Sequence, residues 1–206
     1  MLSRSLAQLD YINENALSRP LLLIDSDILV NRSLESLFCQ DFDVALTWRH
    51  LKSAPINGGL IILNNRRPDV VRAFFRRFVM IFQQRYRHKG QWFGDQLALR
   101  DLIGLSHHAL SRAHILSIDG CRVLLLSCED YNFSPDCRLS AIADPLEDKF
   151  ILHFKGARKT LMERFWVTHL EPRELLWPFS KMAGFRARRQ LHELMTQADP
   201  EPSPGQ

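Results

Sequence analysis

The chain has 206 residues, of which 46% are hydrophobic and 24% are charged, and its formal net charge is +4. A chain of this size and composition can bury the core of a globular domain and is neither fibrous nor intrinsically disordered. The mild positive charge suits anionic ligands such as nucleotides, or contact with an acidic membrane surface. No nucleic-acid-binding motif accompanies the charge, so nucleic acid is not an expected partner.

Localisation is inferred from the N-terminus, the apolar runs and the cysteines. Polar and acidic residues stand where a signal peptide needs an apolar core, and no run approaches the roughly 18 apolar residues of a membrane span. The cysteines form no CxxC pair, and reduced thiols are the default in the cytosol. The basic stretch around 185–189 suggests peripheral contact with the inner face of a membrane, although a solvated helix face is the plain alternative. We therefore expect a cytoplasmic protein.

Strands and helices alternate along the first half of the chain. Residues 4–18 have the pattern of a short helix, and the apolar run 21–24 is typical of a strand buried on both faces. That run ends in the triplet Asp25-Ser26-Asp27. Residues 44–47 and 59–63 are predicted as the second and third strands.

A long helix is predicted next, from about Pro68 to Tyr86. It carries a stripe at spacings of three and four that predicts a core face, formed by Val71, Phe75, Phe78 and Phe82. A shorter helix is predicted from Asp95 to Gly104, since glycine is a common helix-ending residue. Short strands follow at 113–117, 123–126 and 150–153, and the chain is then helical to about 195. These elements predict a single α/β domain over 1–195 with a mixed sheet flanked by helices, and a disordered tail over 196–206.

The triplet Asp25-Ser26-Asp27 is the first candidate site. Open α/β sheets bind ligands at the carboxyl ends of their strands. Two carboxylates one residue apart can both reach one hard cation, and Mg²⁺ or Mn²⁺ bound in this way commonly also binds substrate phosphates. The plain alternative is a polar strand end at which Asp27 begins a turn.

Two polar clusters follow. In Asn57-Gly58-Gly59, paired glycines permit a tight turn and a close approach of backbone to a ligand, while the Asn57 amide offers a donor and an acceptor for sugar hydroxyls. An ordinary loop is the alternative. Asp95 and Gln96 open the shorter helix, where a helix N-cap at Asp95 without functional role is the alternative.

The last cluster is His153, Gly156 and Lys159. A histidine at a strand end can complete a metal site, a glycine frees the backbone, and a lysine can meet a phosphate as a point charge. A structural histidine is the alternative. Three other histidines lack a carboxylate or cysteine partner at metal-ligand spacing, namely His107, His108 and His114.

In their order and spacing, these clusters resemble the GT-A glycosyltransferases, most closely the family 8 type that includes bacterial lipopolysaccharide galactosyl- and glucosyltransferases. The similarity covers roughly residues 15–166, and the combination is far more specific than any one motif. The matching stretches are 22–30 (strand and DxD motif), 57–64 (N-x-G strand), 95–99 (DQ helix), 131–133 (YN element), and His153, Gly156 and Lys159 (HxxGxxK pattern).

The resemblance implies a GT-A-like (Rossmann-like) fold and a role for each matched residue. It implies that Asp25, Asp27 and His153 coordinate Mn²⁺ or Mg²⁺, which bridges the diphosphate of a nucleotide sugar as a Lewis acid. It makes Asp95 and Gln96 the nearest candidates for catalysis at the anomeric carbon. The implied substrate-binding residues are Asn57, Gly58, Gly59, Asn132, Gly156 and Lys159.

The implied reaction is transfer of a hexose from a nucleotide-diphosphate sugar, such as a UDP-sugar, to a saccharide or glycolipid acceptor with retention. Only about twenty residues precede Asp25, whereas family members begin with strands and helices that bind the base and ribose. We therefore expect that the first βα units are absent or that an upstream start has been lost. A shortened sheet would expose an edge that favours pairing with another chain, so a homo-oligomer is also considered.

Two alternatives stay open. A transferase-like domain without its base-binding half would be an inactive binding or accessory subunit. A strand ending in Asp-x-Asp also begins phosphohydrolases of the haloacid-dehalogenase type, but these usually carry Gly and Thr after the second Asp, where this chain has Ile28 and Leu29.

Overall fold

A computed structural model describes residues 2–87, 93–105, 114–136, 138 and 146–170. They belong to two compact units, one formed by Met1–Ser26 and Ser33–Phe133 and the other by Asp27–Arg32 and the chain from Ser134 onward. The single domain over 1–195 stays a prediction. The expected disordered tail and the basic stretch around 185–189 lie outside the described residues.

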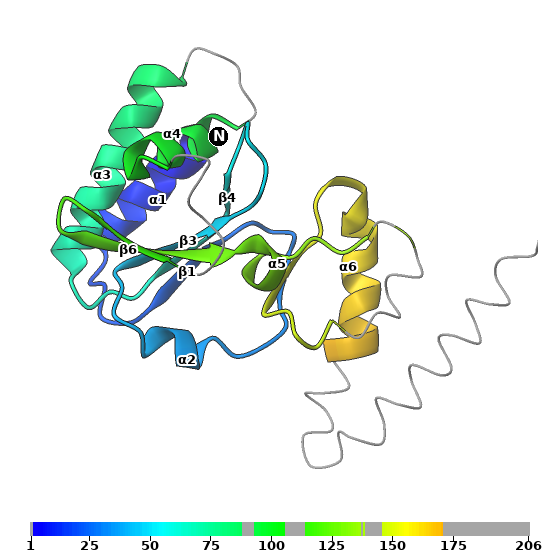
Figure 1. Cartoon of the computed structure of the whole chain (residues 1–206). Helices are drawn as coiled ribbons and strands as arrows, with labels where there is room; N and C mark the ends of the chain where they lie inside the picture. The colour runs from blue at the N-terminus through cyan, green and yellow to red at the C-terminus, as the bar shows by residue number, and fades with distance from the viewer. Residues whose placement is uncertain (1, 88–92, 106–113, 137, 139–145, 171–206) are drawn as a thin grey trace, which may run out of the picture. The chain divides into compact units, whose positions relative to one another are not determined.

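The first unit is built on a five-stranded sheet with the order β1-β4-β3-β6-β5 (Figure 1). Strand β3 runs parallel to β6, and the other neighbouring pairs are antiparallel. The expected mixed sheet is therefore confirmed. The strands are β1 (Leu21–Ile24), β3 (Val44–Trp48), β4 (Ile56–Leu63), β5 (His114–Ile118) and β6 (Cys121–Ser127).

Burial distinguishes the centre of this sheet from its edge. Every residue of β3 and β4 is buried, as a continuous apolar run predicts for a central strand. The expectation that β1 is buried on both faces is wrong, since Leu21–Leu23 are half-buried and Ile24 is 47% exposed. The cause is that β1 pairs with β4 on one side only and is the last strand of the sheet.

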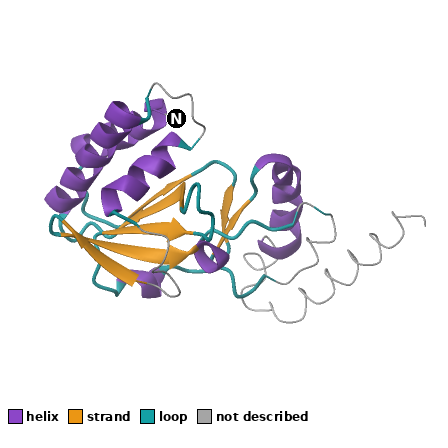
Figure 2. Cartoon of the chain, turned by 45° about the horizontal axis from the view of Figure 1, so that its top comes forward, coloured by secondary structure: helices purple, strands orange, loops and turns teal. Residues whose placement is uncertain are grey.

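Helices α1, α3 and α4 pack together on one side of the sheet, and α2 lies on the other (Figures 1 and 2). The predicted core stripe of α3 is confirmed, because all four of its residues are buried, with Phe75 and Phe78 rings 6.1 Å apart. Helix α4 ends at Gly104, whose φ of 63° suits a residue without a side chain. The helices are α1 (Leu2–Glu14), α2 (Glu35–Phe38), α3 (Pro68–Arg85), α4 (Gly94–Ile103) and α5 (Cys128–Tyr131).

The second unit contains a small antiparallel sheet of β2 (Ile28–Val30) and β7 (Ile151–His153), and the sequence pattern did not predict β2. A helical segment follows β7, and its Phe165 ring packs 5.8 Å from the Phe154 ring and 4.4 Å from the His169 ring. That segment consists of η2 (Gly156–Arg158), α6 (Lys159–Phe165) and the π-helix η3 (Trp166–Leu170). None of the described helices has the length and apolarity needed to cross a bilayer.

Substitutions on opposite faces of α3 test the packing of the first unit. Phe75 is fully buried, whereas Met80 on the same helix is 45% exposed. We expect Phe75→Ala to lower the free energy of unfolding by about 3–5 kcal/mol, since it leaves a cavity in the core. Met80→Ala should change it by less than about 0.5 kcal/mol. Urea unfolding followed by circular dichroism measures both, and equal losses would contradict the assigned core face.

Candidate functional site

Pairing of β2 with β7 brings polar side chains together in the second unit. In the register of the two strands, Ile28 is opposite His153, and the Phe154 N–H donates to the Asp27 carbonyl at 2.8 Å. As a result, the Nε2 atom of His153 lies 3.1 Å from one carboxylate oxygen of Asp27. The other oxygen lies 3.3 Å from the Lys159 ammonium at the start of α6. Three residues from the sequence-predicted site thus meet around one carboxylate.

Burial determines the protonation state of this histidine. His153 is 3% exposed and Asp27 is 9% exposed, whereas the Lys159 side chain is 58% exposed. Burial, followed by the positive charge of Lys155, lowers the pKa of His153 to about 4, against the opposing effect of Asp27. The imidazole is therefore neutral at physiological pH, which is the form that binds metal ions.

Gly156 begins the turn between His153 and Lys159. Its φ of 59° lies in the left-handed region, so a glycine is favoured there for conformational reasons. The expectation that the backbone here uses the conformational freedom of a glycine is confirmed. A Cβ atom at Gly156 would meet no other atom within 4 Å, so its role is conformational rather than steric.

In the first unit, the guanidinium of Arg4 contacts the other two predicted carboxylates, those of Asp25 and Asp95. Asp25 directly follows β1, and its N–H donates to the Gly59 carbonyl at 2.9 Å, which extends the ladder between β1 and β4. The Asp25 carboxylate pairs with Arg4 from α1, and Arg4 also reaches Asp95 at 2.5 Å and the Gly58 carbonyl at 3.3 Å. Sequence reasoning missed Arg4, because no local pattern relates it to partners 21 and 91 residues away.

Gly58 has a steric reason to be glycine. A Cβ atom on it would lie 3.3 Å from an oxygen of Asp95 and 3.4 Å from both an Arg4 nitrogen and the Gln96 side chain. The backbone at Gly58 thus closely approaches these side chains. The expected close approach to a ligand stays a prediction, whereas the predicted tight turn is wrong. Gly58 and Gly59 lie inside β4, which begins at Ile56.

A chain of hydrogen bonds links the predicted asparagines through a residue that the sequence did not single out. The amide of Asn132 donates to the Thr47 hydroxyl at 2.8 Å, and that hydroxyl donates to the Asn57 carbonyl at 3.2 Å. The side-chain oxygen of Asn57 accepts from the Gly59 N–H. Asn57 is 2% exposed, yet its Nδ2 atom has no hydrogen-bond partner among the described residues. A buried donor in this state calls for a partner such as a ligand oxygen or an ordered water.

At the start of α4, arginines contact both catalytic candidates, Asp95 and Gln96. The helix N-cap is Phe93, so the alternative that Asp95 is the N-cap is wrong. Asp95 is 1% exposed and accepts from the Gln96 N–H as well as from Arg4. The Oε1 atom of Gln96 accepts from Arg49 at 3.0 Å. Of the weaker candidates, His114 is an exposed residue of β5, and His107 and His108 lie outside the described residues.

The second unit offers possible metal ligands, and the first unit offers oriented polar groups for hydrogen bonding. Asp27 and the neutral His153 offer ligand atoms for a divalent cation, beside the ammonium of Lys159. In the first unit, Asn57 offers an unpaired buried donor, and Asp95 and Gln96 are oriented by arginines that the sequence did not single out.

No protein-family model and no curated protein matches the chain. Among solved structures, it is similar to a glycosyltransferase involved in the glycosylation of the major capsid of PBCV-1, with 13% identity over 80% of this chain and 74% of that one and a TM-score of 0.49. The glycosyltransferase GlyE of Streptococcus pneumoniae TIGR4 has 18% identity, coverage of 97% and 47%, and a TM-score of 0.47. The galactosyltransferase LgtC, in complex with donor and acceptor sugar analogs, has 19% identity over 77% of this chain and 63% of that one, with a TM-score of 0.46. The chain spans about half of GlyE and less than two thirds of LgtC. With TM-scores below 0.5, function has to be argued from the site residues.

Proposed function

We propose that this chain is a metal-dependent glycosyltransferase of the GT-A kind, similar to family 8. It transfers a hexose from a nucleotide-diphosphate sugar, such as a UDP-sugar, to a saccharide or glycolipid acceptor with retention. The observation that carries the proposal is the meeting of Asp27 with the neutral His153 and with Lys159. A carboxylate and a neutral imidazole are cation ligands, and the ammonium is a counter-charge for phosphates.

The proposed metal ligands are the carboxylates of Asp25 and Asp27 and the imidazole of His153. Asp25 is included because one residue separates it from Asp27 in the chain. Mg²⁺ strongly prefers oxygen ligands, so the imidazole favours Mn²⁺ over Mg²⁺. When bound, such a cation offsets the charge that develops on a departing nucleoside diphosphate.

The chain's own residues would hold and orient the donor. Lys159 would contact the diphosphate, since its side chain is 58% exposed and its ammonium lies beside Asp27. The unpaired Nδ2 atom of Asn57 is suited to donate to a sugar hydroxyl, which would satisfy a buried group. Arg4 pairs with Asp25 and Asp95, and Asp95 is only 1% exposed.

The phosphohydrolase alternative has weaker support. In such an enzyme the first carboxylate of the triplet acts as the nucleophile. Here an oxygen of Asp25 accepts from the Arg4 guanidinium, which draws electron density away from the carboxylate.

A cytoplasmic location with peripheral membrane contact goes with the proposed glycolipid acceptor. The membrane contact rests on the basic stretch around 185–189. The cytoplasmic location and homo-oligomerisation stay predictions. Sedimentation with vesicles of anionic lipid would test the membrane contact.

Removal of one proposed ligand tests metal binding. We expect Asp27→Asn to weaken binding of Mn²⁺ with UDP or GDP by about 10- to 100-fold or more, since even supporting residues of metal sites have effects of that size. Isothermal titration calorimetry measures the affinity. The matched control is Asp69→Asn, which removes the same charge from a carboxylate that is 98% exposed on α3. Wild-type protein that binds no nucleoside diphosphate or nucleotide sugar with Mn²⁺ would refute the proposed function.

Conservative substitution of Arg4 tests the arrangement in the first unit. Arg4→Lys should lower turnover by about 100-fold, because a lysine cannot place two nitrogens on two carboxylates, and loss of one fixed donor in an active site has effects of this size. Release of nucleoside diphosphate from a panel of nucleotide sugars measures turnover. Arg76→Lys, on an exposed part of α3, is the control and should leave it unchanged. If wild-type protein binds these donors but releases no product with any acceptor, the binding-subunit alternative is favoured instead.

A further inference from the structure

We propose that Arg49 is a positioning residue that fixes the carboxamide of Gln96 so that its NH₂ group, and not its oxygen, is available to the substrate. The proposal rests on the proposed function, in which Gln96 lies near the reacting sugar. It assigns Gln96 the part of a hydrogen-bond donor and removes it as a nucleophile.

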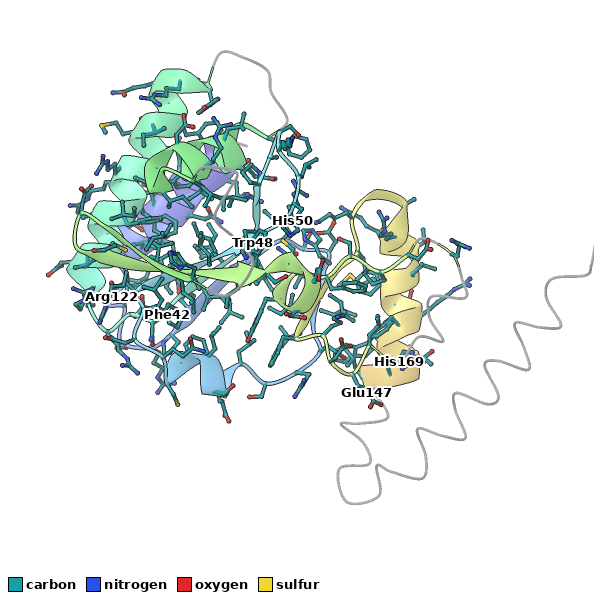
Figure 3. The ribbon with its side chains drawn as sticks, viewed as in Figure 1. Phe42, Trp48, His50, Arg122, Glu147 and His169 are labelled. Atoms are coloured by element: carbon teal, nitrogen blue, oxygen red, sulfur yellow. The ribbon has the colours of Figure 1, made fainter. Side chains whose placement is uncertain are left out.

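Arg49 is held in place by the connection between β3 and β4. Its backbone N–H donates to the Pro55 carbonyl at 2.8 Å, and its Nε atom donates to the Ala54 carbonyl at 2.9 Å. Figure 3 labels its two neighbours, Trp48 and His50, whose rings meet edge-on with centroids 4.7 Å apart. The Arg49 guanidinium is therefore held by a hydrogen bond within its own hairpin, independently of its contact with α4.

The contact with α4 identifies the atoms of the Gln96 amide. A terminal nitrogen of Arg49 lies 3.0 Å from Oε1 of Gln96. The oxygen and nitrogen of an amide are commonly hard to tell apart, but a guanidinium has only donors. The atom that faces it must therefore be the oxygen, and Nε2 is the end of the amide left for a substrate oxygen.

The surroundings make this orientation stable. Gln96 is 8% exposed, and no described carboxylate lies within ion-pair distance of Arg49, so the guanidinium is not drawn away by a competing negative charge. The Phe93 ring, centred 5.9 Å from the guanidinium carbon, covers the same group. Arginine keeps its charge at all relevant pH values, so the contact is a charge-assisted hydrogen bond.

Chemistry at the sugar follows from this orientation. A lone pair of Oε1 is engaged with a cation, which lowers the nucleophilicity of an amide oxygen that is already weakly nucleophilic. Nε2 can donate to a hydroxyl or ring oxygen of the donor sugar or to the acceptor. No covalent bond between Gln96 and the sugar forms in this arrangement.

Gln96→Glu separates the two roles. It keeps an oxygen toward Arg49 and replaces the NH₂ donor by a carboxylate oxygen, a better nucleophile. If Nε2 is the working atom, turnover should fall about 100-fold, as for removal of other fixed donors, with no sugar attached to the protein by mass spectrometry. Retained turnover in Gln96→Glu, which lacks the NH₂ donor, would overturn the proposal.

Substitution of Arg49 tests the positioning itself. Arg49→Met should lower kcat by about 10- to 100-fold, as for other residues that orient a ligating or catalytic group, while affinity for Mn²⁺ and UDP stays unchanged. Arg49→Lys, which retains one charge, should restore part of the activity and serves if the methionine variant does not fold. The control Lys52→Met changes an exposed residue of the same hairpin connection and should have no effect.

A spectroscopic readout keeps this inference separate from the proposed function. In a ¹⁵N-labelled protein without substrate, the side-chain NH₂ resonances of Gln96 should shift in Arg49→Met and stay in place in Lys52→Met. An unchanged Gln96 signal in Arg49→Met would refute the positioning role. If the signal shifts but wild-type protein neither binds nor turns over nucleotide sugars, the proposed function fails instead. Loss of nucleotide affinity equal to the loss of kcat would also overturn the specific role of Arg49.

Discussion

The pairing of Arg4 with Asp25 and Asp95 is the interaction on which the first unit's site depends. Asp95 is 1% exposed, and a carboxylate buried to that degree costs several kcal/mol of free energy unless a partner compensates it. Arg4 supplies the opposite charge from α1, and the Gln96 N–H supplies a hydrogen bond. Because the same guanidinium also contacts the Gly58 carbonyl, it ties α1, β1, β4 and α4 together. The missing side chain at Gly58 leaves the space in which these groups meet.

In the second unit, too, a buried carboxylate lies beside a cation, which here is the exposed Lys159. Asp27 has Lys159 on one oxygen and a neutral imidazole on the other. A second positive charge at His153 would be costly, since burial and the charge of Lys155 already lower its pKa to about 4. Asp27 therefore lies between one cation, Lys159, and one neutral imidazole, the form of histidine that binds metal ions.

The sequence was sufficient for features that arise from local patterns. Apolar runs located β3 and β4, helical spacing identified the buried face of α3, and Gly104 marked the end of α4. It did not reveal that β1 is a strand at the edge, because an apolar run is alike in both settings. It also did not reveal β2, a three-residue strand that forms only by pairing with β7 more than a hundred residues later.

The site was predictable to the same extent and for the same reason. Motif order pointed to Asp27, His153 and Lys159, which the structure brings together. Arg4 and Arg49 were not predicted, because arginines at helix and hairpin positions are common and their partners lie far away in sequence. The crowding around Gly58 was not predicted, and strand β4 stands where a tight turn was expected, since contacts from α1 and α4 have no local signature.

The two arginines together constrain what the first turn of α4 can do. Oδ1 of Asp95 accepts from the Gln96 N–H and Oδ2 accepts from Arg4, while Oε1 of Gln96 accepts from Arg49. All three side-chain oxygens of the two catalytic candidates are thus engaged by donors, two of them cationic. A nucleophile needs an oxygen whose electron density is directed at the reacting carbon, whereas here that density is directed at fixed donors. In the proposed sugar transfer, this turn would therefore supply the Nε2 donor of Gln96 beside a carboxylate paired with Arg4, rather than a nucleophile.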